Sequence, residues 1–477
     1  MSSVSTRTID RRLNGTVSKV TTEYRNRPGQ PASEGTRFQG VLVPLWASIP
    51  LAAAAGAILD AGFPDRGWWV LAPVGVLLML IALVGRGPWA GGLVGTVAAF
   101  SFWLIHISWL TLYLGPVPWL ALSALQGILF GIGLFLISVV LRLGPRVWLS
   151  ALAVQLMRET QLRPSARWGI AIGAIAVLTV VPPWPIAQTG ATTLAAVQGA
   201  SDAGLFAQYK PGQILNDHAS TTLPLIGQDV DFVVWPENLS DIDPTRSGDA
   251  AQLTDEISRN MNAPLITGTI TLRDGQYYNS SLLWKAGQGA VALYDKVHPV
   301  PFAEYMPDRA FWRLFAPDLV DLVSRDYTIG TLNNVFDING ILAGIAICFD
   351  ITDDRLLSEM IDAEAEIILA QSNNADFGYT DESVQQLAIA RLRAIETGRT
   401  VVNISTVGSS AIITADGRTV DSLQAWRPGA MVQTVPLSDT VTPAMAVGRA
   451  LGIFLSGLGL AGLTLCIANR PAKSFRR

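Results

Sequence analysis

Charged residues, cysteines and histidines are all scarce in this chain of 477 residues. Only 15% of the residues are charged, whereas about 25% is usual for a soluble domain, so we expect part of the chain to lie in lipid. The three histidines and two cysteines form no CxxC or HExxH spacing, which argues against a zinc site. A net charge of -4 without a basic recognition motif argues against binding to nucleic acid. The chemistry is therefore expected to come from carboxylates, lysines and a cysteine, without a metal.

Long apolar runs account for the shortage of charge. Their lengths approach the roughly 20 residues that a helix needs to cross a bilayer core, and they cover residues 41–62, 68–85, 90–113, 117–141, 168–184 and 445–469. These runs predict a transmembrane helical region over residues 41–185 and a C-terminal transmembrane helix over residues 445–469. The polar segment 1–40 is expected to be a disordered basic cytoplasmic tail, and residues 470–477 a second cytoplasmic tail.

Residues 190–436 have a different composition, in which charged residues interrupt short β-rich runs such as "VDFVVW". They predict a folded domain between the membrane segments. The side on which this domain lies depends on residues 147–168, which begin as an apolar run but carry Arg158 and Arg163. If this stretch stays in the cytoplasm, the excess of Lys and Arg falls on one side and the domain is extracytoplasmic, as we expect. If the stretch crosses the membrane, the domain is cytoplasmic.

The two cysteines are expected to lie far apart. Cys466 falls near the cytoplasmic end of the last apolar run, where packing in the membrane explains it. Cys348 ends the β-prone run in "ILAGIAICFD" within the exported domain, so we expect no disulfide between them. A lone cysteine behind such a strand is usually a small buried hydrophobe. An unpaired cysteine in an oxidising compartment can also be a reactive thiol.

Two other segments place charged side chains just beyond a predicted strand. In "VDFVVWPEN" the proline stops the strand immediately before Glu237. The segment "YDKVHPVPFAEYMP" follows the apolar run "GAVALY" and carries Lys296 and Glu304. Because Cys348 also follows a strand, the three segments are expected to meet where sheets of mixed α/β folds assemble their sites.

These residue types form a coherent catalytic set. A thiol becomes a strong nucleophile when a base removes its proton, and Glu237 is the candidate base. Lys296 and the backbone N–H of Phe349 can stabilise an oxyanion, and the loss of such a donor typically costs about 2.7 to 4 kcal/mol. Each residue alone has an ordinary structural explanation, but together in one exported domain they favour acyl transfer.

The motifs around these residues resemble those of the nitrilase superfamily: "WPE", "YDKVHPVPFAEYMP" and "ICFD" follow in the same order. With apolar helices on both sides, the chain from about 41 to 470 resembles the bacterial apolipoprotein N-acyltransferases, and "ARLRAIETGR" and "NISTVGSSAIITADGR" extend the match. The resemblance implies an α/β four-layer αββα sandwich inserted between transmembrane helices. It also implies a multi-pass protein of the bacterial plasma membrane with an extracytoplasmic catalytic domain.

The reaction implied by the resemblance is a two-step acyl transfer that needs no cofactor. Cys348 would take an acyl chain from a phospholipid to form a thioester. The α-amine of the N-terminal diacylglyceryl-cysteine of a lipoprotein would then attack that thioester. By matching positions, Glu237 would be the base and Lys296 the oxyanion stabiliser, while Glu304 would orient Lys296.

The segment "PDRAFWRLFAPDLVDLV" after the lysine loop contains large apolar side chains close to acidic residues. Its large apolar side chains are Phe311, Trp312, Leu314 and Phe315. We expect a lid or an interfacial arm that touches lipid, with an ordinary core helix as the alternative. His106 lies in an apolar run and is interpreted as a packing or hydrogen-bonding residue.

Three positions depart from the family's usual pattern. Phe349 and Asp350 follow the cysteine where the family usually has Tyr-Glu, and Asp376 in "SNNADFG" stands at the family's tryptophan. We expect Asp350 to fix the loop that presents Cys348. The departures are expected to alter substrate preference, because Glu237, Lys296 and Cys348 are all present.

Two other classes of protein remain open from the residues. One is a membrane-tethered amidase of the nitrilase type, in which water takes the place of the lipoprotein amine. The other is a non-catalytic scaffold that recruits a membrane or cytoplasmic partner, such as an enzyme of lipid or glycan synthesis, through the basic N-terminal tail. The flanking apolar helices favour the transferase over the amidase, because a soluble amide needs no access from lipid.

Overall fold

The structure is a computed structural model that describes residues 41–143 and 184–468, except for 202–203, 205–206, 208, 239–240, 316 and 324. The expectations for both terminal tails, for residues 147–168 and for nearly all of the apolar run 168–184 lie outside the described residues. The side chain of Cys466 is likewise not described, so the expected absence of a disulfide stays a prediction.

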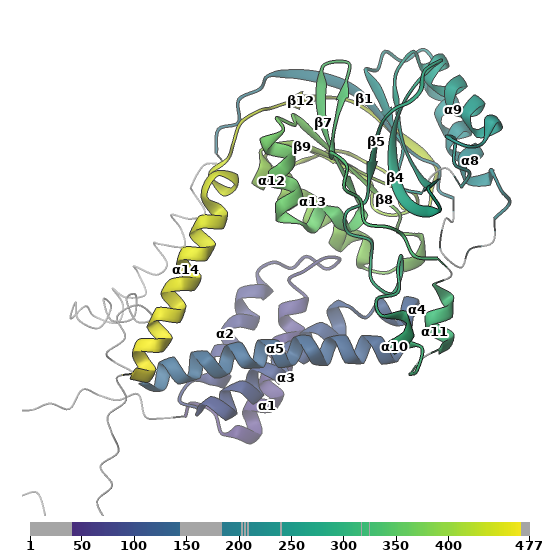
Figure 1. Ribbon diagram of the computed structural model, residues 1–477. Helices are drawn as coiled ribbons and strands as arrows, with labels where there is room; N and C mark the ends of the chain where they lie inside the picture. Colours follow the sequence, from purple (N-terminus) through teal and green to yellow (C-terminus); the bar gives the residue numbers. More distant parts are fainter. Residues whose placement is uncertain are drawn as a thin grey trace, which may run out of the picture. The chain divides into compact units, whose positions relative to one another are not determined.

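Two six-stranded mixed sheets form the centre of the β-rich part (Figure 1). The first sheet has the order β12 (Gly429–Leu437), β1 (Gly190–Gln198), β2 (Phe232–Val234), β3 (Leu265–Arg273), β4 (Gln276–Lys285) and β5 (Gly289–Asp295). The second has the order β11 (Thr419–Ser422), β10 (Ala411–Ile413), β9 (Thr400–Ser405), β8 (Ile367–Ser372), β7 (Ile341–Ile347) and β6 (Val335–Ile338). In each sheet three neighbouring strands are parallel, namely β1, β2 and β3 in the first and β7, β8 and β9 in the second, and the other pairings are antiparallel.

The alternation of side chains along the strands sorts the core into layers. In β7, Ile345 and Ile347 join a cluster formed by both sheets, whereas Ala346 packs with the helices α12 (Asp354–Asp362) and α13 (Glu382–Thr397). In β2, Val233 faces away from the shared cluster, toward the helices α8 (Gln213–Thr222) and α9 (Gly248–Met261). Helices thus cover the outer face of each sheet (Figure 1). This order of layers is compatible with the expected αββα sandwich.

Apolar helices precede and follow the sheets. They are α1 (Leu45–Asp60), α2 (Leu71–Leu83), α3 (Pro88–His106), α4 (Leu110–Leu114), α5 (Pro116–Leu143) and α14 (Pro443–Ala468). Of the described helices, α3, α5 and α14 are long and apolar enough to cross a membrane. Helix α1 has 16 residues and α2 has 13, so each is shorter than the apolar run that predicted it, 41–62 or 68–85. A segment of turns between the two helices takes up the ends of these runs. The number of crossings therefore stays a prediction.

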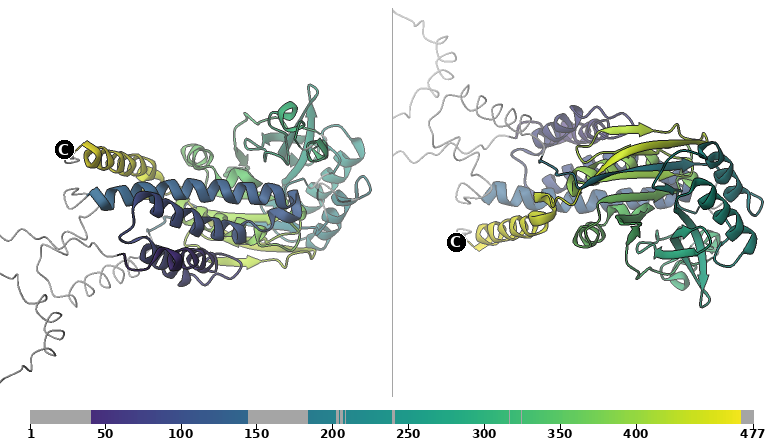
Figure 2. Two further views of the ribbon diagram at one scale, coloured as in Figure 1. Left: turned by 90° about the horizontal axis from the view of Figure 1, so that it is seen from below. Right: turned by 90° about the horizontal axis from the view of Figure 1, so that it is seen from above.

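Small residues let the first helices approach one another closely. A Cβ atom on Gly56 of α1 would lie 2.1 Å from the backbone oxygen of Ala98 in α3, so only glycine fits this crossing. Close contacts of this kind drive helix association in lipid. Helix α14 instead extends away from the sheets (Figure 2), and nearly all of its apolar stretch Pro443–Thr464 is unburied. A bilayer would cover this exposed apolar surface.

Candidate active site

The three residues expected to carry the chemistry each follow a strand. Cys348 comes directly after β7, at the start of the 3-10 helix η2 (Cys348–Thr352), and Lys296 comes directly after β5. Glu237 is the third residue beyond the end of β2. All three line one cavity of about 500 Å³, together with Glu304. The first sheet supplies Glu237 and Lys296, and the second supplies Cys348.

A buried ammonium group joins the two glutamates. The Nζ atom of Lys296 lies 3.0 Å from Oε1 of Glu237 and 2.8 Å from Oε2 of Glu304. Lys296 is only 1% exposed, and its backbone N–H donates to the carbonyl of Asn279 at 2.8 Å. Oε2 of Glu304 also accepts the backbone N–H of Val300. The position of the lysine is therefore fixed through both its backbone and its side chain.

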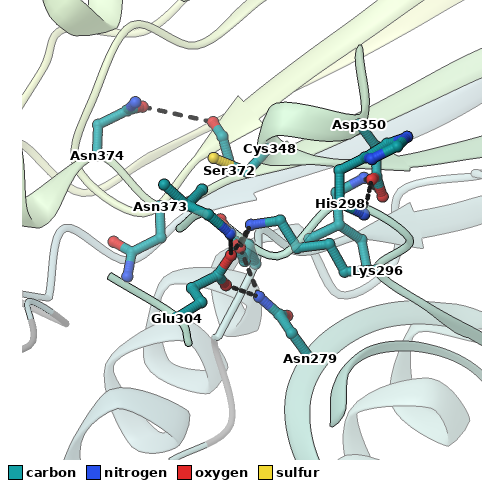
Figure 3. A network of polar contacts seen from close by, with 12 residues as sticks. Asn279, Lys296, His298, Glu304, Cys348, Asp350, Ser372, Asn373 and Asn374 are labelled. Atoms are coloured by element: carbon teal, nitrogen blue, oxygen red, sulfur yellow. Dashed lines mark hydrogen bonds and ion pairs between the residues drawn. The ribbon is translucent and has the colours of Figure 1, made fainter. Parts of the chain in front are cut away.

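Asn279 is a site residue that the sequence did not reveal. Its Nδ2 donates to Oε1 of Glu237 and to Oε1 of Glu304, each at 2.7 Å (Figure 3). The amide thus holds two carboxylates side by side in a buried place. Its only signal in the sequence is a polar residue in the middle of the strand β4, and many exposed strand faces share that signal.

Burial and charge together set the proton affinities at this centre. Burial raises the pKa of Glu237, Lys296 lowers it, and Glu304 raises it again, with a net increase. Burial opposes the charge on Lys296, but Glu237 and Glu304 outweigh that effect and raise the lysine pKa. Burial and the charge of Glu237 raise the pKa of the Cys348 thiol, although Lys296 lowers it. The resting cysteine is therefore a thiol that needs a base, and the raised pKa makes Glu237 a stronger base than an exposed carboxylate.

Asp350 organises the turn that presents the half-buried Cys348. Its Oδ2 accepts the hydroxyl of Tyr294 at 2.8 Å and the backbone N–H of Ile347 at 3.3 Å, and its Oδ1 accepts the N–H of His298 at 2.9 Å (Figure 3). Cys348 itself has a φ of 51°, a conformation that costs a non-glycine residue about 1 to 3 kcal/mol. The hydrogen bonds to Asp350 help to hold this strained residue in place.

We expect Asp350→Ala to lower the rate of Cys348 acylation about tenfold and to lower the unfolding temperature, because three buried hydrogen bonds are lost. The rate is read by intact mass after incubation with phospholipid, and stability is read by thermal unfolding. Asp362→Ala at the end of the neighbouring helix α12 is the matched control, since that side chain is exposed. Equal acylation rates in the two variants would show that Asp350 does not position the thiol.

The segment after the lysine loop forms two short helices, α10 (Arg309–Trp312) and α11 (Pro317–Leu322). Phe311, Trp312, Leu314 and Phe315 are all exposed there, whereas Val320 and Val323 of the same segment are buried against Met306. Arg309 holds the segment by donating to the carbonyls of Val320 and Val323. Val323 lines the cavity that contains Cys348, but Phe311, Trp312 and Phe315 do not.

The structure also describes the surroundings of Phe349, Asp376 and His106. The side chain of Phe349, next to the cysteine, is 48% exposed. Asp376 lines the cavity, in the short helix η3 (Ala375–Phe377). The Nδ1 of His106 lies 3.1 Å from Oδ1 of Asp60, as expected for a hydrogen-bonding histidine. Among the described residues, no group of three or more potential metal ligands is present.

Comparisons with known proteins match both parts of the chain. Residues 184–442 match the family of carbon-nitrogen hydrolases, and residues 55–193 match the N-terminal domain of apolipoprotein N-acyltransferase. The chain is 28% identical to the apolipoprotein N-acyltransferase of Mycolicibacterium smegmatis, over 92% of this chain and 89% of the relative. It is also 28% identical to the apolipoprotein N-acyltransferase of Pseudomonas aeruginosa, over 88% of this chain and 92% of the relative.

Other similarities are more limited. The apolipoprotein N-acyltransferase 1 of Treponema pallidum is 30% identical over 50% of this chain and 48% of the relative. Among solved structures, an amidase from Nesterenkonia sp. covers 53% of this chain and 93% of its own, with 15% identity and a TM-score of 0.41. The matches to the two family domains extend over most of the chain. The chain therefore belongs to the carbon-nitrogen hydrolase family and, within it, to the apolipoprotein N-acyltransferases.

Proposed function

We propose that this protein transfers an acyl chain from a phospholipid, through a thioester on Cys348, to the α-amine of the N-terminal diacylglyceryl-cysteine of a lipoprotein. The observation that carries the proposal is one cavity lined by Cys348, Glu237 and Lys296 in a chain that also has apolar helices of membrane-spanning length. A nucleophile, a base and a buried cation are the groups that acyl transfer requires. Apolar helices keep such a site near substrates that are themselves anchored in lipid.

In the first step, Glu237 takes the thiol proton and Sγ of Cys348 attacks the carbonyl carbon of the phospholipid ester. Lys296 and the backbone N–H of Phe349 stabilise the oxyanion that forms. The ester C–O bond then breaks, the thioester remains on Cys348, and the leaving alkoxide takes the proton from Glu237. The first product is a lysophospholipid.

In the second step, the uncharged α-amine of the lipoprotein attacks the thioester carbonyl. Glu237 takes a proton from the attacking nitrogen, the C–S bond breaks, and the amide product leaves. The proton on Glu237 then returns to the thiolate, which restores the starting enzyme. Glu304 keeps Lys296 in position through both steps, because it accepts from Nζ at 2.8 Å.

Two arginines of the cavity support a phosphate-containing acyl donor. Arg246 and Arg325 line the cavity beside Asp241, Asp243 and Asp376. Asp241 accepts the backbone N–H groups of Gly212 and Leu215, and Asp243 accepts that of Thr245, so both carboxylates are already engaged by the backbone. A phosphodiester is the kind of group that arginine binds well.

The exposed aromatic arm supports contact with lipid. Phe311, Trp312 and Phe315 lie on a segment held next to the cavity through Val323. We assign this arm to the membrane interface, where aromatic side chains are favoured. In that position it can guide acyl chains toward Cys348.

A transfer assay tests the proposed function. Purified protein in mixed micelles receives a phospholipid with labelled acyl chains and a synthetic peptide with an N-terminal diacylglyceryl-cysteine. We expect the peptide to gain one labelled acyl group, and the same peptide with an acetylated α-amine to gain none. Release of labelled free fatty acid instead would indicate a hydrolase, and no release or transfer at all would favour a scaffold.

The site is proposed to face the outside of the plasma membrane of a multi-pass protein, as the distribution of Lys and Arg suggests. In a variant without native cysteines, Gln288→Cys at the exposed turn between β4 and β5 should react with an impermeant maleimide added to intact spheroplasts. Ser3→Cys should react only after the membrane is permeabilised. The reverse pattern of labelling would place the catalytic domain in the cytoplasm.

A further inference from the structure

A second group of buried polar side chains lies behind Cys348, and the steps above do not use it. Gln386 on α13 is 8% exposed, and its Nε2 lies 3.5 Å from Sγ of Cys348. Asn374, between β8 and α13, is 2% exposed and lies next to Gln386. Polar groups buried this deeply next to a reactive atom call for a chemical explanation.

The hydrogen bonds of Asn374 fix which end of the Gln386 amide faces the sulfur. Ser405 donates its hydroxyl to Oδ1 of Asn374 at 2.6 Å. Ser372 also donates to this atom, at 3.4 Å, and Figure 3 shows the contact between Ser372 and Asn374. The Nδ2 of Asn374 therefore points the other way, and it donates to Oε1 of Gln386 and to Oε2 of Glu382, each at 2.8 Å. Because Oε1 of Gln386 accepts from Asn374, the N–H group of Gln386 is left to face Cys348.

We propose that Gln386 is a further catalytic residue, which donates a hydrogen bond to the Cys348 thiolate, and that Asn374 and Glu382 are positioning residues that orient its amide. The proposal rests on the proposed function, in which Cys348 is the nucleophile. It adds a neutral donor to the thiolate from the second sheet, whereas Glu237 and Lys296 come from the first. Its consequence is a more stable thiolate when the thiol loses its proton and when the thioester breaks.

The charges around the sulfur explain why such a donor is needed. Lys296 favours the thiolate, but Glu237, Glu382 and Glu304 all oppose it. Burial adds to that opposition and raises the thiol pKa. A hydrogen bond to an ionised group is stronger than one to a neutral group, so the N–H group of Gln386 favours the charged form of the sulfur.

The charge of Glu382 should make the stability of the Cys348 thiolate depend on pH. Burial raises the pKa of Glu382 to about 7, Asn374 lowers it by a hydrogen bond, and the charge of Glu237 raises it. Below pH 7 the carboxyl is therefore mostly neutral, and above pH 7 its charge opposes the thiolate. Removal of that charge should favour the thiolate above pH 7 and have little effect below it.

Alkylation of Cys348 by iodoacetamide at several pH values tests the proposal without any lipid substrate. In the full-length protein, Gln386→Met should raise the thiol pKa by about one unit, because the donor to the thiolate is lost. At a pH below the thiol pKa, alkylation should then be about tenfold slower than in the parent. Gln386→Glu should slow it further, because it places a carboxylate against the sulfur. Gln385→Met is the matched control, since that amide bonds to Trp109 and to the carbonyl of His106.

The variant Glu382→Gln should act in the opposite direction. We expect it to alkylate several times faster than the parent above pH 8 and at the parent's rate below pH 6. A purely structural role would slow alkylation in every variant and at every pH. If Gln386→Met does not fold, Gln386→Glu and Glu382→Gln still decide the question by the opposite signs of their effects.

The outcomes separate this proposal from the proposed function. If both Gln386 variants and Glu382→Gln were alkylated at the same rate as the parent at every pH, the proposed role of Gln386 would be wrong, whatever the acylation assay shows. Conversely, the expected alkylation profiles together with no acylation of the parent by phospholipid would keep Gln386 as a donor to the thiolate and remove the acyltransferase.

Discussion

Replacement of Cys348 by serine is expected to abolish the acyl-enzyme and to reduce transfer to the peptide on the order of 10⁴-fold or more, as for other losses of a catalytic nucleophile. The hydroxyl has nearly the size of the thiol, so the turn held by Asp350 should be preserved. A serine hydroxyl has a far higher pKa, however, and a carboxylate such as Glu237 cannot remove its proton to a useful extent. Intact mass after incubation with phospholipid measures the adduct directly.

Two controls make this result interpretable. Thermal unfolding of Cys348→Ser should match the parent, which excludes loss of the fold as the cause. Cys348→Ala should be equally inactive, because neither variant has a thiol. If Cys348→Ser were acylated as fast as the parent, the nucleophile would be another residue and Cys348 would be an ordinary buried side chain.

Replacement of Glu237 by glutamine is expected to slow acylation by about 10² to 10⁴, the usual contribution of a general base. The amide oxygen can still accept from Lys296 and Asn279, so the local geometry should survive. The variant lacks the base that takes the thiol proton and returns it to the leaving alkoxide. The measurement is a single-turnover time course of acyl incorporation.

Alkylation of the same variant distinguishes a base from a residue that merely positions the thiol. The negative charge of Glu237 raises the thiol pKa, so its removal should leave alkylation by iodoacetamide much less affected than acylation. Glu359→Gln, on the exposed face of α12, serves as the control for loss of a carboxylate. An equal fall in acylation and in alkylation would argue that Glu237 only shapes the site.

The positions of Glu237, Lys296 and Cys348 could be predicted because each depends on local sequence. Each signal lies within a few residues of the sequence. The signals are a proline after an apolar strand, a lysine after an apolar run and a cysteine at the end of a strand. The structure confirms that each follows a strand and that they line one cavity. Their catalytic roles remain a proposal that the two variants test.

Asn279, Asn374 and Gln386 could not be predicted because their importance arises only when distant segments meet. Asn279 lies 42 positions along the chain from Glu237, and Gln386 lies 38 positions from Cys348. Both are ordinary polar residues within a strand or a helix when considered alone. Hydropathy also did not predict the lengths of α1 and α2, because composition does not show where a helix ends and the chain turns.

The most direct test of acyl transfer through Cys348 is a pulse and chase of the acyl group on this residue. Purified protein is loaded from a phospholipid with labelled acyl chains, excess lipid is removed, and the mass of the Cys348 peptide is followed over time. The proposed mechanism predicts a thioester on Cys348 that persists in water and disappears when the diacylglyceryl-cysteine peptide is added, as the label appears on the α-amine of that peptide. A labelled peptide product without any acyl group on Cys348 at any time would contradict it.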